Sequence, residues 1–132
     1  MLPDMEVVGP LQIRVLHHLW THGPCTVHAV HAALNAENAA NGAKTMAYTT
    51  VLTVMRNLVR RNILAQVRGN RAHHFQPLIE RRDYCQGMLR QARQELFHGD
   101  VRALLSTVAD DEQVDVQLRE RIRSLVLERA SA

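Results

Sequence analysis

The chain has 132 residues, of which 46% are hydrophobic and 22% charged, with one Trp, two Tyr, two Phe and a formal net charge of +3. This length suits one globular domain, or one domain with an appended element. A core poor in aromatic residues must be aliphatic, which favours helices over a β-sandwich. The sequence has neither a run of about 20 apolar residues, as a membrane span requires, nor the basic start of a signal peptide. We therefore expect a cytoplasmic protein with no membrane segment.

Two amphipathic helices are predicted near the start of the chain. Residues 9–22 carry apolar side chains at helical spacing and are followed by a Gly-Pro pair, which ends a helix. A second helix begins after Thr26, whose hydroxyl can cap its first turn. The stretch 35–44 is rich in Asn, Ala and Gly, and it is predicted to be a mobile loop of unassigned role.

A third amphipathic helix, over about residues 48–62, is the most informative segment. Its apolar residues fall on one side, and its other faces carry hydroxyl, amide and guanidinium groups but no carboxylate. Short hydroxyls can approach base edges or phosphates closely, and Arg can grip guanine or phosphate with two parallel hydrogen bonds. These properties suit a DNA-recognition helix, although an ordinary surface helix with a basic end has the same pattern. The candidate DNA-contacting residues here are Tyr48, Thr49, Thr50, Leu52, Thr53, Arg56, Asn57, Arg60 and Arg61.

A short β-hairpin is predicted directly after this helix. Asn62 can stop the helix, residues 63–68 and 71–76 resemble two short strands, and the Gly-Asn pair between them signals a two-residue turn. A helix followed at once by a hairpin with a basic tip is typical of a helix-turn-helix with a wing. A solvated hairpin with incidental charge is the alternative. The candidate DNA contacts of the wing are Arg68, Asn70 and Arg71.

The positive charge is concentrated on this same region. Residues 1–43 have a net charge of −2 and residues 94–132 a net charge of −3, whereas residues 44–93 carry ten basic residues against two acids, a net of +8. A local excess of this kind attracts a polyanion, because each neutralised phosphate releases counterions and adds salt-dependent affinity.

Three further helices are predicted from about residue 80 onward. The second of them follows Asp100 as a cap, and three acids at 110–112 are predicted to open the last, because acids suit a helix N-terminus. These helices carry more apolar surface than they can bury among themselves, which predicts pairing with a second copy of the chain. Folding back onto the N-terminal part as a monomer is the alternative. The candidate dimer-interface residues are Met88, Leu89, Leu96, Leu104, Leu105, Val108, Leu118, Ile122 and Leu125.

Together these patterns predict a mainly α protein. A winged helix-turn-helix domain of three helices and a short β-hairpin occupies residues 1–79, and a helical dimerisation region occupies residues 80–132. We expect no cofactor and no metal, since the His-x-x-x-His pair lacks the Glu of a zinc protease. The chain also has no nucleophile elbow or phosphate loop, so we expect no enzyme activity. The two cysteines form no Cys-x-x-Cys pair and are expected to be reduced thiols.

Four runs of the sequence resemble the penicillinase repressor family of the BlaI/MecI type. They are Leu19-Trp20, residues 26–30 (Thr-Val-His-Ala-Val), residues 47–58, which begin Ala-Tyr-Thr-Thr-Val-Leu-Thr-Val, and residues 71–77. The resemblance covers roughly residues 9–112, and the Tyr-Thr-Thr-Val-x-Thr-Val run is fairly specific to it. Members are winged-helix repressors that bind palindromic operators as homodimers through a three-helix C-terminal region. The resemblance implies the same fold, double-stranded DNA as partner, and repression.

The resemblance also suggests a role for each part of the DNA-contacting helix. Thr49, Thr50 and Thr53 match positions that face the major groove. Leu52 stands where several members have a basic residue, which implies a different base preference, such as an apolar contact with a thymine methyl group. The Arg and Asn residues of the helix and wing are assigned to phosphates. Trp20, Val30, Val51, Leu58 and Phe75 are assigned to the core.

The sequence motifs by which members of this family are inactivated are less closely matched in this chain. In antibiotic-responsive members, a membrane sensor protease triggers cleavage at an Asn-Phe bond in the C-terminal region, whereas the matching place here is Thr107-Val108. The cysteine-rich end of the copper-responsive relatives is not matched, since no Cys follows Cys85. The operator, the regulated genes and the inducing signal are not readable from the chain. A winged-helix module whose Arg cluster binds an acidic protein is the alternative function.

Overall fold

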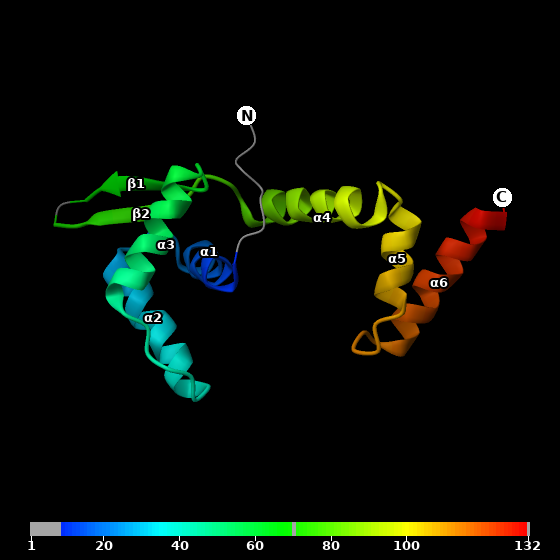
Figure 1. Cartoon of the computed structure of the whole chain (residues 1–132), viewed down its shortest axis with the longest axis horizontal. Helices are drawn as coiled ribbons and strands as arrows, with labels where there is room; N and C mark the ends of the chain where they lie inside the picture. Colours follow the sequence, from blue (N-terminus) through cyan, green and yellow to red (C-terminus); the bar gives the residue numbers. More distant parts are fainter. Residues whose placement is uncertain (1–8, 70, 132) are drawn as a thin grey trace. The chain divides into compact units, whose positions relative to one another are not determined.

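The computed structural model describes residues 9–69 and 71–131, with side chains up to Glu128 (Figure 1). The chain divides into two compact units, Met1–Cys85 and Gln86–Ala132. The described part contains six helices and one two-stranded antiparallel sheet. This confirms the predicted fold class, a mainly α chain with three helices and a hairpin followed by three more helices.

The first two helices of the first unit are α1 (Pro10–His22) and α2 (Val27–Ala40). Pro10 occupies the first turn of α1, where its missing N–H costs nothing, and Gly23 ends the helix with a positive φ of 82°. The Thr26 hydroxyl accepts a hydrogen bond from the Ala29 N–H at 3.1 Å, as predicted for a capping residue.

The predicted loop over residues 35–44 is wrong in its first half, because α2 continues to Ala40. Ala is the strongest helix former, and it balances the weaker propensity of the interspersed Asn residues. The helix ends only near Gly42, which has a positive φ of 69°. The connection to the next helix is therefore residues 41–47, and it is tied to α2 by side chains.

The third helix, α3 (Tyr48–Arg60), has Arg61 as its C-cap, and Asn62, the residue predicted to stop it, follows directly. Asn62 adopts a left-handed conformation with φ 60°, and the Ile63 N–H donates to the Leu58 carbonyl at 2.9 Å. This is the hydrogen bond of a Schellman motif, which satisfies a carbonyl at the end of the helix and turns the chain into the hairpin.

The hairpin consists of β1 (Leu64–Arg68) and β2 (His73–Pro77), with Arg68 opposite His73. Four residues connect the strands, so the predicted two-residue turn is wrong. The Gly69 N–H donates to the Ala72 carbonyl at 3.0 Å. On the other edge of β2, Phe75 exchanges two backbone hydrogen bonds with Cys25, which anchors the hairpin to the start of α2.

The core of the first unit lies where α1, α2, α3 and the hairpin meet. Four of the five residues assigned to the core are buried, whereas Trp20 is half-buried. The Trp20 indole N–H donates to the Ile79 carbonyl at 3.0 Å, and its ring packs 5.5 Å from the Tyr84 ring. Trp20 thus needs an edge position, since a fully buried indole N–H would lack this partner. The buried apolar residues are Val15, Leu16, Leu19, Val27, Val30, Leu34, Val51, Met55, Leu58, Ile63, Leu64, Phe75 and Tyr84.

Replacing Leu58 by Ala should test this core. The Leu58 side chain is 0% exposed, so its truncation removes buried apolar contacts and leaves a cavity, and we expect the free energy of unfolding to fall by about 2 to 5 kcal/mol. Urea denaturation followed by circular dichroism measures this change. Leu78→Ala is the matched control, because Leu78 is 57% exposed and the same truncation there should cost little. Equal losses in the two variants would contradict the core described above.

The second unit begins within α4 (Arg81–Phe97) and continues with α5 (Val101–Ala109) and α6 (Val116–Ser131). Asp100 caps α5 as predicted, because its carboxylate accepts hydrogen bonds from the N–H groups of Arg102 and Ala103. The predicted start of α6 at residues 110–112 is wrong. Asp115 accepts a hydrogen bond from the Leu118 N–H at 3.1 Å and caps the helix instead.

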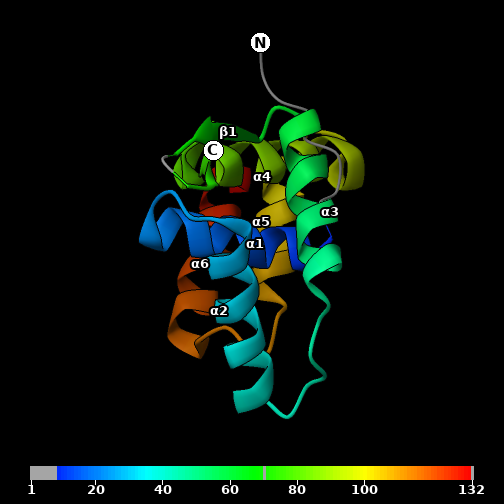
Figure 2. The same ribbon diagram turned by 90° about the vertical axis from the view of Figure 1, so that its left-hand side faces the viewer.

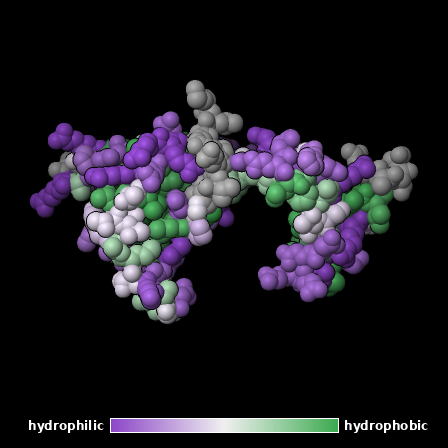
Figure 3. Space-filling model, viewed as in Figure 1, coloured by the Kyte–Doolittle hydropathy of each residue, from purple (hydrophilic) through white to green (hydrophobic). Residues whose placement is uncertain are grey.

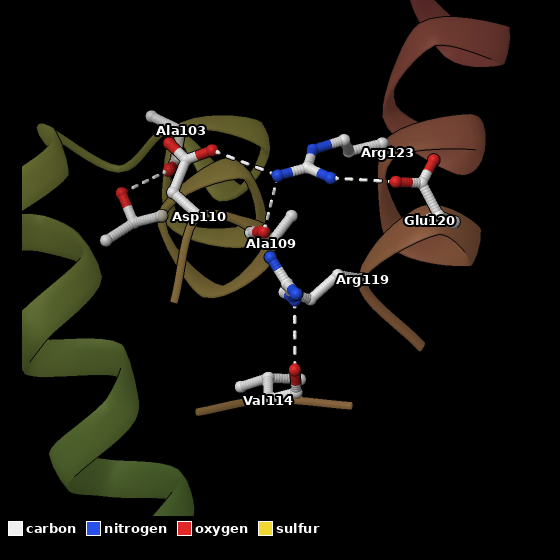
Figure 4. A network of polar contacts seen from close by, with 8 residues as sticks. Ala103, Ala109, Asp110, Val114, Arg119, Glu120 and Arg123 are labelled. Atoms are coloured by element: carbon white, nitrogen blue, oxygen red, sulfur yellow. Dashed lines mark hydrogen bonds and ion pairs between the residues drawn. The ribbon is translucent and has the colours of Figure 1, made fainter. Parts of the chain in front are cut away.

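An arginine on α6 joins the last two helices (Figure 4). The Arg123 guanidinium donates to the Ala109 carbonyl at 2.8 Å, lies 3.6 Å from the Asp110 carboxylate and pairs with Glu120 at 3.0 Å. Asp110 therefore pairs with an arginine side chain rather than opening α6. These contacts hold the α5–α6 corner together through polar groups, while many leucines of the same unit stay exposed.

Candidate nucleic-acid interface

The outer face of α3 is exposed, basic and free of carboxylates. Val51, Met55 and Leu58 are fully buried on the inner face, and this fixes which side of the helix looks outward. Hydroxyls occupy the N-terminal half of the outer face, and guanidinium groups occupy the C-terminal half. The exposed predicted DNA contacts are Tyr48, Thr49, Thr50, Thr53, Arg56 and Arg60.

Three predicted contacts of α3 lie on its flanks. Leu52, Asn57 and Arg61 are half-buried. The charge of Arg61 acts on the Tyr84 hydroxyl: burial raises the pKa of Tyr84, and Arg61 opposes that rise. Arg61 therefore lies close to the core side of the helix, and it is less available to an outside partner than Arg60.

The first turn of α3 has no side-chain cap. Its N-cap residue, Ala47, has no side chain that could accept a hydrogen bond from the first turn. Tyr48 is 43% exposed, and its ring lies edge-on to the His31 ring with the centroids 5.7 Å apart. Three α2 side chains, His31, Asn35 and Asn38, contact the segment before α3, and our sequence analysis missed them. Their i, i+4 and i, i+3 spacing is the signal that could have revealed a shared helix face.

The wing adds two exposed arginines. Arg68 ends β1 and Arg71 lies in the connection between the strands, and both are exposed. Asn70, the third predicted wing contact, lies outside the described residues. In the space-filling view, hydrophilic surface covers this hairpin (Figure 3). Within the described part of the chain, the exposed arginines of α3 and the wing form no ion pair, so their charge is available to a partner.

A hollow of about 550 Å³ separates α3 from the hairpin and the start of α2. Arg56, His28 and His73 lie on its rim together with Thr26, and Leu52 and Phe75 supply apolar surface. No carboxylate lines it. The flank of α3 is thus also suited to an anionic neighbour, because no carboxylate in the hollow would repel one.

The histidines of α1 form a stacked pair. The rings of His18 and His22 lie 4.3 Å apart, and His22 Nδ1 is 3.1 Å from the His18 carbonyl oxygen. Burial lowers the pKa of His18, His22 lowers it further, and Glu37 opposes both effects. Among the residues that the structure describes, no three His, Cys, Asp or Glu side chains are grouped so that they could hold a metal ion.

The second unit exposes an unusual amount of apolar surface. Ala109 is its only buried apolar residue among those described. Of the predicted dimer-interface residues, Met88, Leu104, Leu105 and Ile122 are half-buried, whereas Leu89, Leu96, Val108, Leu118 and Leu125 are exposed. A groove of about 360 Å³ between α4 and α5 is lined by four apolar residues, Leu89, Val101, Leu104 and Leu105, and by Gln86, Arg90 and Arg93. Green apolar patches lie over these helices in Figure 3.

Comparison with known proteins identifies the family. The family model described as penicillinase repressor matches residues 8–128, nearly the whole chain. The chain belongs to the penicillinase repressor family. The description of this family and the names of its matched relatives are those of repressors and transcriptional regulators, not of enzymes.

Relatives of this penicillinase repressor family member agree with that placement. It is 37% identical over 83 residues to proteins called transcriptional regulator BlaI from two strains of Mycobacterium tuberculosis, CDC 1551/Oshkosh and H37Rv. The match covers 62% of this chain and 56% of each relative, so the chain spans about half the length of the curated relatives it matches.

A solved structure shares a similar fold with this chain at low sequence identity. The hsRosR-S1 complex structure gives a TM-score of 0.54 with 15% identity, covering 97% of this chain and 96% of that one. The transcriptional regulator Tm0710 from Thermotoga maritima gives a TM-score of 0.44 with 17% identity, covering 93% of this chain and 78% of that one.

Within the described residues, no helix is both long and apolar enough to cross a membrane.

Proposed function

We propose that this chain is a transcriptional repressor that binds double-stranded DNA at an inverted-repeat operator as a homodimer. The recognition helix α3 enters the major groove, and the wing lies against the phosphate backbone. One observation carries this proposal: the outward face of a helix whose inner face is fully buried presents hydroxyls and arginines with no carboxylate among them. The BlaI relatives, which are transcriptional regulators by name, support it.

The two halves of the α3 face have different roles in this proposal. Thr49, Thr50 and Thr53 are short enough to reach base edges and so contribute sequence preference. Arg60 and the wing arginines contact phosphates, which position the protein without reading sequence. Leu52 offers an apolar contact to a thymine methyl group, although it is only half-exposed.

Residues 80–132 form the dimerisation region in this proposal. Several apolar side chains of α4, α5 and α6 are exposed among the described residues, Leu89, Leu96, Leu118 and Leu125 among them. A second copy of the same surface would cover them, and twofold symmetry makes such a pairing self-complementary. The homodimer then presents two recognition helices to two half-sites.

Cleavage at the position that matches the family's protease site is not part of the proposal. Thr107 and Val108 lie inside α5, where the Thr107 hydroxyl donates to the Ala103 carbonyl at 2.9 Å. A protease would have to unwind this helix to reach the bond, because proteases act on opened rather than helical backbone.

Selection of duplexes from a random DNA pool tests the function. We expect the chain to enrich an inverted repeat whose half-sites are about 10 base pairs apart, centre to centre, or a multiple of that spacing, because a twofold dimer must place both helices on one side of the duplex. Mobility shifts on the enriched duplex and on a scrambled one measure specificity, and their salt dependence measures the phosphate contacts. A chain that binds acidic proteins instead would enrich no duplex, and that result would refute the proposal.

A further inference from the structure

The segment before the recognition helix is bound to α2 by a side-chain clasp made of His31, Asn35 and Asn38. Asn35 holds both backbone polar groups of Met46: its Oδ1 accepts from the Met46 N–H at 2.8 Å, and its Nδ2 donates to the Met46 carbonyl at 3.1 Å. His31 Nε2 lies 2.8 Å from the same carbonyl oxygen. The returning chain is visible beside the lower end of α2 in Figures 1 and 2.

The chemistry of these groups makes the clasp specific. An asparagine amide has one acceptor oxygen and a donor nitrogen, so it can pair with an N–H and a carbonyl as a neighbouring strand would. The Met46 carbonyl can only accept, so a hydrogen bond to it from His31 Nε2 requires the tautomer that carries the proton on that nitrogen, and the Asn35 Nδ2 lies 2.9 Å from the same nitrogen. Leucine has the branching of asparagine at Cγ but neither hydrogen-bonding group, and it could not replace Asn35 in this role.

Asn38 secures the segment farther from the helix. It is the one buried polar side chain among the described residues, at 8% exposure. Its side-chain Nδ2 donates to the Lys44 carbonyl at 2.8 Å, and its backbone carbonyl accepts from the Ala43 N–H at 2.7 Å. A buried side-chain amide without the Lys44 partner would be costly, so this bond fixes residues 43–44 against α2.

The clasp acts where α3 has no cap of its own. Ala47 cannot cap the helix by a side chain, and uncapped first turns fray. Asn35 fixes the residue immediately before Ala47, and the His31 ring supports Tyr48 immediately after it. The backbone is therefore held on both sides of the point where α3 begins, one residue before the hydroxyl face starts at Thr49.

We propose that Asn35, with His31 and Asn38, is a positioning residue that fixes the first turn of the recognition helix and thereby sets the sequence specificity of DNA binding. This inference rests on the proposed function. Loss of the clasp loosens Thr49 and Thr50, which read bases, and leaves Arg60 at the far end of α3 in place. Binding to a preferred sequence should therefore weaken while binding to unrelated DNA persists.

The test compares the full-length variant Asn35→Leu with Asn41→Leu, a matched control in the same segment. Asn41 is exposed and caps α2 through its backbone N–H alone in the described contacts. The probes are a duplex that the wild-type chain enriches from a random pool and a scrambled duplex of equal length. For Asn35→Leu we expect about tenfold weaker binding to the enriched duplex, as for one lost base contact, and unchanged binding to the scrambled one. Amide hydrogen exchange at Met46 should become faster, and Asn41→Leu should change none of these.

Each alternative result has a definite meaning. If Asn35→Leu weakens binding to both duplexes equally, Asn35 has only a structural role and the inference is wrong. Unchanged exchange at Met46 would also overturn it, because the clasp would not hold that residue. If the wild-type chain enriches no duplex at all, both the proposed function and this inference are wrong. That result differs from one in which the wild-type chain enriches a duplex and Asn35→Leu binds it as tightly, which would contradict the inference alone.

Discussion

The variant Leu125→Asp is expected to be monomeric and to bind the full operator at least about 100-fold more weakly than the wild-type chain. Leu125 lies on α6 and is 61% exposed, so the substitution does not disturb the packing of the single chain. In the homodimer it would place a carboxylate in an apolar interface, twice because of the symmetry, and burying an unpaired charge is strongly unfavourable. The second half-site would then no longer be bound by a tethered partner, which removes the effective-concentration advantage.

Sedimentation equilibrium measures the mass, and mobility shifts on full and half operators measure the affinity. Binding to a half operator should be almost unchanged, because the first unit is intact. Ser124→Asp is the control, since it adds the same charge to the neighbouring, exposed residue outside the predicted interface set. A wild-type chain that is monomeric at micromolar concentration would refute the homodimer, and a dimeric Leu125→Asp would show that a different face is used.

The helices were predictable because their apolar periodicity agrees with their burial. In α3, the residues at helical spacing are those that the core covers completely, so the exposed face follows from the sequence. Thr26, Asp100 and Asn62 also act at helix ends as their chemistry suggests.

The errors occurred where long-range contacts outweighed local composition. Residues 35–40 have the composition of a loop, yet they are helical. Asn35 and Asn38 are stabilised in the helix because the segment that follows α2 accepts hydrogen bonds from their side chains. Acids precede α6 at two places, and local charge could not choose between them. In the structure, Asp110 pairs with Arg123, and Asp115 caps α6. The pairing of Asp110 depends on how α5 and α6 pack against each other.

The candidate DNA-binding face was predictable except at its margins. At 3.6 residues per turn, Arg61 lies about 100° around the helix from Arg60, on the flank of the outer face, so side-chain spacing alone could not tell whether it faces solvent or Tyr84. The wing connection was similarly underdetermined, because a Gly-Asn pair suits both a two-residue turn and the longer connection that the register requires.

The division of roles along α3 predicts different effects for two further variants. Arg60→Ala should weaken binding to every duplex and reduce the slope of log K against log salt concentration by about one for each protomer bound, because each protomer loses one phosphate contact and its released counterion. Mobility shifts at several salt concentrations give this slope for enriched and scrambled duplexes. Arg102→Ala removes the same charge from an exposed position in the second unit and should leave the slope unchanged.

Thr53→Val should instead weaken binding to the enriched duplex only and leave the salt slope unchanged. Valine keeps the shape and β-branching of threonine and removes only the hydroxyl, so the exposed helix surface is preserved. Affinity for the enriched duplex should fall by about 1 to 3 kcal/mol, the value of a lost base contact, while the salt slope and the affinity for scrambled DNA stay the same. The loss should be confined to one base-pair position in each half-site, since a hydroxyl reaches one base edge. If Thr53→Val instead weakened both duplexes equally, the hydroxyl half of α3 would contact phosphate, and sequence reading would have to come from elsewhere on the helix or from the wing.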